Sequence, residues 1–168
     1  MPRARRQTGF NPYEILHALD RERVAYVLVG GLARVLEGSD EITRGVDLTP
    51  STRPENLRRL EVTLERLDAR PLGGGALSLE ALDQTPVLEL QSDHGEIKLV
   101  REPEGTRGYD DLRRAARREA IGEGLRVPVA SPGDLVRMLS ALGRERDELK
   151  IETMRRVVEL DRGLVIGR

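Results

Sequence analysis

The stretch that decides the fold is VLVGGLARVLEGSDEITRGVDLTP, residues 27–50. The nearly continuous apolar run over 24–29 is rich in β-branched residues and predicts a short strand buried on both faces. Gly30-Gly31 ends that run, and helical character resumes over 32–37. A second strand is expected over 42–48. The pattern is therefore a strand, a glycine turn, a helix and a second strand.

The glycine turn is a candidate phosphate site. Gly30 and Gly31 would expose bare backbone N–H groups at the positive end of a helix, although such a pair taken alone is more often just a tight turn. Residues two apart on a strand share a face, so positions 45 and 47 point together toward this turn. Two carboxylates there and a third on a neighbouring strand would chelate two Mg²⁺ ions for in-line attack on a nucleoside triphosphate.

The rest of the chain predicts alternating helices and strands around a mixed sheet. Proline-started helices are expected over 12–22, from Pro54 and from Pro132, the last capped by Ser131 and ended by Gly143. The further expected elements are a hairpin of 87–90 and 96–100, an arginine-studded helix over 109–120, an extended edge segment over 125–129, and a last helix over 145–162. This order predicts an α/β (α+β) domain with two closing helices.

Composition excludes several classes of protein. The chain has 168 residues, a formal net charge of −1 and no cysteine, which leaves no disulfide framework and no thiolate metal site. No run approaches the ~18 apolar residues of a membrane span, and the basic start is not followed by the apolar stretch of a secretory signal. Near-neutral charge and scarce aromatics argue against a strong nonspecific nucleic-acid binder. We expect a cytoplasmic protein without a membrane partner.

Five landmarks in order give the sequence a resemblance to a known family. They are VGGLA from residue 29, VDLTPSTRPENLRRL from 46, GTRGYDDLRRAA from 105, LRVPVASPGDLVRM from 125 and GRERD from 143. They resemble the nucleotidyltransferase (polymerase β-like) superfamily, and within it the small bacterial branch related to the AbiEii toxins of toxin–antitoxin systems. The resemblance implies a minimal nucleotidyltransferase fold that moves a nucleotide from an NTP onto tRNA or protein with Mg²⁺, and a cognate toxin–antitoxin protein as partner.

Carried over motif by motif, the resemblance implies a nucleotide site at the Gly30-Gly31 turn with Asp47 as the remaining acid. It also implies that Thr43 contributes to this site, and that Arg146 of the last motif approaches the triphosphate from the helical side. Arg144 and Lys150 are neighbours of Arg146 with the same implied role.

The departures from the family pattern concern catalysis. The first acid of the family's strand falls at Gly45, and its third falls at Lys98, so two of three metal carboxylates are replaced. The family's His-Gly is Glu37-Gly38. Lys98 is one of only two lysines beside 26 arginines. An ammonium at ~4 Å would repel a bound cation by several kcal/mol at an effective dielectric near 20.

Two functions follow. In the first, the chain is a pseudoenzyme that binds a nucleotide, an RNA or a protein partner. Either Lys98 then pairs with Asp47 in place of a metal and the glycine turn can take a phosphate, or the site has decayed and Lys98 makes a structural salt bridge or lies exposed on an edge. In the second, it is an active Mg²⁺-dependent nucleotidyltransferase with unorthodox ligands around Asp47. The expected organisation is a flexible basic arm over 1–10, a nucleotidyltransferase-like core over 11–130 and a helical pair over 131–168 packed on the core.

Overall fold

A mixed seven-stranded sheet forms the centre of the molecule. The computed structural model describes residues 9–166, and the strands lie in the order β3-β4-β5-β2-β1-β7-β6. β2 runs antiparallel to β1 and parallel to β5, while β7 runs parallel to β1. Their bounds are β1 Tyr26–Val29, β2 Gly45–Pro50, β3 Arg70–Pro71, β4 Val87–Ser92, β5 Gly95–Val100, β6 Arg117–Gly122 and β7 Leu125–Val129. The α/β fold class and the mixed sheet predicted from sequence are confirmed.

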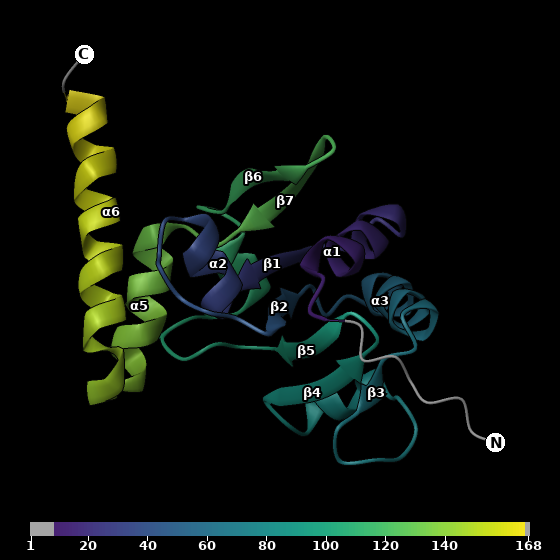
Figure 1. Ribbon diagram of the computed structural model, residues 1–168. Coiled ribbons are helices and arrows are strands. Elements are labelled where there is room, and N and C mark those ends of the chain that lie inside the picture. Colours follow the sequence, from purple (N-terminus) through teal and green to yellow (C-terminus); the bar gives the residue numbers. More distant parts are fainter. Residues whose placement is uncertain (1–8, 167–168) are drawn as a thin grey trace.

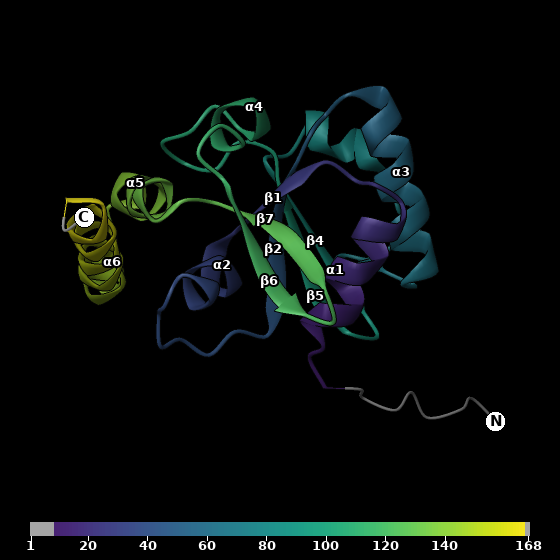
Figure 2. The same ribbon diagram turned by 90° about the horizontal axis from the view of Figure 1, so that it is seen from above.

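Helices flank the sheet on both sides (Figure 1). α1 and α3 lie side by side on one side, and α5 and α6 form a second pair on the other, as the view from above also shows (Figure 2). The helix bounds are α1 Pro12–Arg21, α2 Gly30–Leu36, α3 Pro54–Arg66, α4 Tyr109–Leu112, α5 Pro132–Leu142 and α6 Glu148–Ile166, with 3-10 turns at Leu79–Asp83 and Glu145–Asp147.

The predicted helix starts are confirmed by their caps. The side chain of Asn11 accepts a hydrogen bond from the backbone N–H of Glu14, and that of Ser131 accepts one from Asp134. Each cap satisfies one of the backbone donors that a helix leaves free at its first turn. Gly143 ends α5 in the left-handed conformation, with φ 62°.

The core is aliphatic, as the scarcity of aromatic residues requires. Four-residue β1 is buried along its whole length, which confirms the strand predicted to be covered on both faces. The buried stripe of α3, which includes Leu60 and Leu64, packs into the same cluster as β1. No helix among the described residues is long and apolar enough to cross a membrane.

The helix predicted over 109–120 is wrong. α4 ends at Leu112, and β6 begins at Arg117 and pairs antiparallel with β7. The turn between β6 and β7 runs through Gly122, Glu123 and Gly124, which all have positive φ values. These turn residues commit the segment to a hairpin, so the basic helical face predicted there does not form.

Two strand predictions also need correction. β7 is not an edge strand: it lies between β1 and β6, and it tolerates Pro128 because it pairs with β1 at a single position, Leu28 with Val129. β2 begins at Gly45 rather than at residue 42, and Ile42 is 95% exposed. The segment before Gly45 is held by polar contacts instead of a strand ladder.

The predicted domain boundaries remain a prediction. Residues 1–8 of the predicted basic arm lie outside the described residues, while Phe10 at its end packs against the core. The backbone N–H of Asn11 also donates to the carbonyl of His94, at 2.8 Å, in the β4–β5 turn. The chain is therefore anchored to the sheet from residue 10 onward.

Candidate functional site

The candidate site begins where β1 ends and α2 starts. Val29 and Asp47 are paired residues of neighbouring strands, so the Asp47 carboxylate lies beside the glycine turn that follows Val29. Gly30 has φ +74°, and a Cβ atom there would lie only 2.2 Å from Oδ2 of Asp47. Glycine at position 30 is thus required twice, by the backbone conformation and by the approach of Asp47.

Thr43 and Arg34 complete the surroundings of the glycine turn. A Cβ on Gly31 would lie 3.5 Å from Oγ1 of Thr43 and 3.7 Å from Nη2 of Arg34. The Thr43 hydroxyl donates to the carbonyl oxygen of Gly45 at 3.0 Å, which holds the entry into β2. Arg34 was not predicted as a site residue, although its place one helical turn after Gly30 was available as a signal.

A row of charged side chains crosses three strands next to the turn. Lys98 on β5 is the paired residue both of Asp47 on β2 and of Glu89 on β4, so all three lie on one face of the sheet. Nζ of Lys98 lies 3.7 Å from Oε1 of Glu89. The ion pair of Lys98 is therefore with Glu89, which matches the structural salt bridge and not the direct Lys98–Asp47 pair among the two predicted alternatives.

Burial controls the acidity of Asp47. It raises the pKa of this carboxyl, and the neighbouring acids Glu89 and Glu96 act in the same direction. The charges of Lys98 and Arg34 lower the pKa, and Lys98 is the larger of these two effects. Lys98 thus stabilises the ionised form of Asp47 through space without forming an ion pair with it.

The residues at this face do not fit two divalent cations. A Cβ on Gly45 would lie 2.8 Å from the backbone oxygen of Glu96, because β2 and β5 approach closely at this pair. A carboxylate at position 45 would require the two strands to move apart. At position 98, where the resemblance implies a third acid, the ammonium of Lys98 repels metal ions. Within residues 9–166 no group of three or more Asp, Glu, His or Cys side chains is arranged to hold a metal ion.

A small cavity of about 140 Å³ opens along this face. It is bordered by β2, β4 and β5, the three strands of the charged row, and by the segment that leads into β2. The lining includes Thr43, Arg44, Asp47, Glu89, Glu96 and Lys98. Three acids and two cations, Arg44 and Lys98, thus line one opening, and these two cations offset part of the negative charge that an entering anion would meet.

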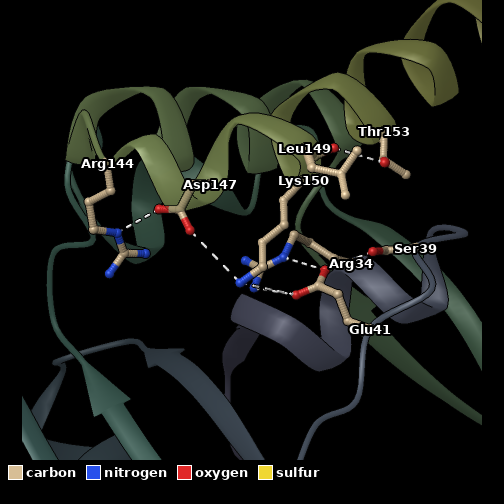
Figure 3. Close-up of polar contacts among 8 residues, drawn as sticks. All are labelled: Arg34, Ser39, Glu41, Arg144, Asp147, Leu149, Lys150 and Thr153. Atoms are coloured by element: carbon tan, nitrogen blue, oxygen red, sulfur yellow. Dashed lines mark hydrogen bonds and ion pairs between the residues drawn. The ribbon is translucent and has the colours of Figure 1, made fainter.

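Beside the glycine turn, α2 is tied to α6 by a network around Glu41 (Figure 3). Arg34 binds the Glu41 carboxylate through two nitrogens, at 2.7 and 2.9 Å, and the Ser39 hydroxyl donates to it at 2.7 Å. Lys150 of α6 approaches the same carboxylate at 3.6 Å. These contacts hold the pKa of Glu41 below its usual value although burial opposes them.

Asp147 is the second acid of this network. It is fully buried, and it accepts a hydrogen bond from Nε of Arg144 at 2.5 Å while Lys150 lies 3.8 Å away. Its Oδ1 atom has no hydrogen-bond partner among the described residues. Burial opposes ionisation, but the Arg144 hydrogen bond and the nearby cations keep the pKa of Asp147 below its usual value.

The structure separates the basic residues expected at the triphosphate. Lys150 reaches Glu41 and so lies next to Arg34 and the glycine turn, and Arg144 holds Asp147 (Figure 3). Arg146 is exposed and contributes to this region through its charge on Asp147. Of the predicted site residues, Gly30, Gly31, Thr43, Asp47 and Lys98 lie together around the end of β1, and within residues 9–166 no hydrogen bond or ion pair joins Arg146 to them.

Comparison with solved structures identifies the fold. The lincosamide antibiotic adenylyltransferase LnuA, solved with lincomycin, has a TM-score of 0.61 at 17% identity over 89% of this chain and 99% of its own. The antibiotic-resistance factor ANT(2'')-Ia has a TM-score of 0.58 at 16% identity, over 87% and 80% of the two chains. TM1012 of Thermotoga maritima, assigned to the nucleotidyltransferases, has a TM-score of 0.57 at 19% identity, over 88% of this chain and 90% of its own. No family model and no curated protein matches the sequence. The chain thus shares the nucleotidyltransferase fold.

Proposed function

We propose that this chain is a nucleotidyltransferase-fold protein that binds the phosphates of a nucleotide without performing two-metal transfer. The observation that carries the proposal is the pair of residues at the positions of the missing acids. Gly45 has no room for a side chain against Glu96, and Lys98 places a cation beside Asp47. The site keeps the glycine turn and replaces two anionic metal ligands by a neutral residue and a cation.

The cations at the site reduce the repulsion that its acids exert on an anionic ligand. Without Lys98, the face would present Asp47, Glu89 and Glu96 to the incoming phosphates and would repel them. Lys98 offsets these acids from the sheet side, and Arg34 lies next to Gly31 on the helix side. A phosphate at Gly31 would therefore lie between two cations and the backbone N–H groups of the turn.

Calorimetry with ATP, GTP, CTP and UTP, each in Mg²⁺ and in EDTA, tests this proposal. We expect binding in EDTA that Mg²⁺ does not strengthen, and a loss of at least tenfold in affinity in Lys98→Met. Lys98→Arg keeps the charge and is expected to keep most of the affinity. The matched control is Arg58→Met, an exposed cation on α3 outside the site. Binding that requires Mg²⁺, or no binding in either buffer, would contradict the proposal.

The competing function is nucleotide transfer. Incubation with labelled nucleotides, Mg²⁺ or Mn²⁺ and total tRNA tests it directly, and we expect no label on RNA or on the protein. Label transfer that disappears in Asp47→Ala would establish the protein as an active enzyme. Such a result would show that Asp47 recruits ligands other than the family's acids.

We further propose that the chain belongs to the AbiEii-related branch and acts in the cytoplasm with a toxin–antitoxin partner. The motif order from VGGLA at residue 29 to GRERD at residue 143 supports this branch. A neighbouring gene for a winged-helix antitoxin, whose product copurifies with the chain at fixed stoichiometry, would support the partner. Failure of the two products to associate when they are coexpressed would count against it.

A further inference from the structure

A second and larger cavity lies at the other end of β1. Its volume is about 550 Å³, and it is formed where the end of α1, the segment after α4 and the β6–β7 hairpin meet. In Figure 2, α1 and α4 both lie on one side of that hairpin, and α2 lies on the opposite side. The cavity is lined by Tyr26 at the start of β1, whereas Gly30 follows its end. Four residues of extended chain separate the two by about 13 Å, so the cavity is distinct from the Asp47 site.

Arginines from four parts of the chain line this cavity. Arg23 follows α1, Arg113 follows α4, Arg118 lies on β6 and Arg126 on β7. Asp20 is the one acid among the described lining residues, which leaves a clear excess of positive charge. Cations gathered from separated segments around one hollow attract an anion more strongly than the same charges dispersed over the surface.

Three of these four arginines form no ion pair within the described part of the chain. Arg113 pairs with Asp110 at 3.4 Å. The guanidinium groups of Arg23, Arg118 and Arg126 form no ion pair or hydrogen bond within residues 9–166, although 34% of the chain is charged. Guanidinium groups bind phosphate oxygens with paired, charge-assisted hydrogen bonds, so these three are available as phosphate ligands.

Tyr26 gives an independent indication of a ligand. Its side chain is buried, with 4% of the residue exposed, and it lines the cavity. No hydrogen bond to its hydroxyl is formed within the described part of the chain, and this oxygen is not among the fully buried side-chain atoms that lack a partner, so it is open to the cavity. Burial raises the pKa of Tyr26, so the hydroxyl stays protonated and offers one O–H donor to a group in the cavity.

We propose that this cavity binds a nucleoside polyphosphate, with the phosphate chain held by Arg23, Arg118 and Arg126. The volume falls within the range of small-molecule pockets, ~300–1,000 Å³. The wall also includes Tyr109 and Pro128, which offer an apolar surface to the base or sugar. A nucleic acid strand is the less suitable occupant, because the net charge of −1 and the four aromatic residues provide neither a long basic track nor a stacking platform.

Calorimetry in EDTA with inorganic tripolyphosphate, ATP and GTP tests the cavity. The variant is Arg118→Gln/Arg126→Gln, and the matched control is Arg58→Gln/Arg155→Gln, which removes the same charge from exposed positions outside the cavity. We expect the wild type to bind nucleotide at two sites, and the cavity variant to lose at least tenfold in affinity for tripolyphosphate and for both nucleotides at the cavity alone, with the Asp47 site still occupied. The control variant is expected to bind within twofold of the wild type. Equal losses in the two variants would overturn the proposal.

Two further variants separate this cavity from the Asp47 site and define its ligand. Lys98→Met is expected to leave binding at the cavity unchanged, so loss of all binding in Lys98→Met would overturn the proposal and leave the function proposed above intact. Tyr26→Phe removes only the hydroxyl, and we expect a loss of two- to fivefold with an unchanged circular dichroism spectrum. Binding of a single-stranded RNA alone, with affinity that grows with its length, would also overturn the assignment.

Discussion

Asp47 and Lys98 are paired residues of two parallel strands, yet the ammonium group of Lys98 lies 3.7 Å from Glu89 and forms its ion pair there. Asp47 is left as a mostly buried carboxyl whose pKa is raised by burial and lowered by the charge of Lys98. A metal centre would use the same position for an acid. The two side chains therefore interact through space, as a cation and a carboxylate that form no direct ion pair.

Replacing Gly30 by alanine is expected to be strongly destabilising. The new Cβ would meet Oδ2 of Asp47 at 2.2 Å, in a backbone conformation of φ +74°. Gly74→Ala is the matched control, since Gly74 has φ +82° but no atom within 4 Å. We expect a cost of about 1 kcal/mol for the control and about 3 kcal/mol or more for Gly30→Ala, measured by urea unfolding.

A double-mutant cycle identifies the cause of that cost. In an Asp47→Gly background the clash is removed, and the cost of Gly30→Ala is expected to fall to that of Gly74→Ala. An unchanged cost in this background would show that the backbone conformation alone, and not the approach of Asp47, requires glycine.

Asp47→Asn is expected to stabilise the protein at neutral pH. The pKa of Asp47 in the folded protein is raised, mainly by burial, so its contribution to stability is present at low pH and is lost as the pH rises through the folded pKa. Asparagine does not ionise and avoids this loss. Thermal unfolding from pH 3 to pH 8 should show the two proteins converging at low pH.

The exposed Asp40 gives the control for that series. Asp40→Asn should follow the wild type across the pH range. A wild-type protein that is more stable than Asp47→Asn at pH 8 would mean that the ionised carboxylate makes a favourable contact and does not merely tolerate its burial.

Glu37 predicts a second pH dependence, at the contact of α2 with β6. Its side chain is 5% exposed, and burial, followed by the charge of Glu119, raises its pKa to about 7, while Arg117 at 3.8 Å opposes the shift. The stability that comes from keeping Glu37 protonated is fully present below pH ~4.5, and it declines as the pH rises toward 7 because the buried carboxyl then ionises. Glu37→Gln should therefore exceed the wild type at pH 8 by roughly 1–3 kcal/mol and match it at pH 4.5.

Urea unfolding at the two pH values measures this difference. Glu65→Gln, at an exposed position of α3, serves as the control and should show no such divergence. A variant that loses stability at pH 8 would show that the Glu37–Arg117 ion pair outweighs the burial of the charge.

Glu41→Gln is expected to destabilise the contact between α2 and α6. The carboxylate binds Arg34 and Ser39 and lies 3.6 Å from Lys150, with 14% of its side chain exposed. Loss of the charge at pH 7 should cost about 1–2 kcal/mol in the free energy of unfolding. These contacts lower the pKa of Glu41 in the folded protein. The difference in the free energy of unfolding between Glu41→Gln and the wild type should therefore disappear as the pH falls through this lowered pKa, because the wild-type carboxyl is then protonated.

The control for Glu41 is an ion pair of similar length on the surface. Glu152 and Arg156 lie 2.8 Å apart on α6, and both side chains are mostly exposed. Glu152→Gln should change the free energy of unfolding by less than ~0.5 kcal/mol. Equal effects of the two substitutions would show that the Glu41 network is no stronger than a surface pair.

The sequence predicted those parts of the site that depend on local geometry. Alternation along β2 places positions 45 and 47 on one face, and a glycine pair after a buried strand predicts a turn at its end. Arg34 and Glu41 were not predicted as a pair, because their contact depends on the path of the loop between α2 and β2. The partner of Lys98 was also undetermined, since both neighbouring strands present an acid to it.

The segment after α4 shows the limit of periodicity. Its closely spaced arginines resemble a solvated helical face, but the Gly122–Gly124 turn makes the segment a strand that pairs with β7. That pairing brings Arg118 and Arg126 to one cavity with Arg23, which is distant in sequence. Only contacts between distant segments override the local preference at such a position.

By itself the sequence determined the order of strong helices and strands, the glycine turn and the residue types at positions 45, 47 and 98, because caps, periodicity and residue identity are local properties. The tertiary structure decided which charges neutralise each other. Lys98 forms an ion pair with Glu89, and Lys150 forms one with Glu41. Arg23, Arg118 and Arg126 line a cavity without forming ion pairs within residues 9–166. Electrostatic energies depend on distance and burial, and both are set only when strands and helices from distant parts of the chain pack together.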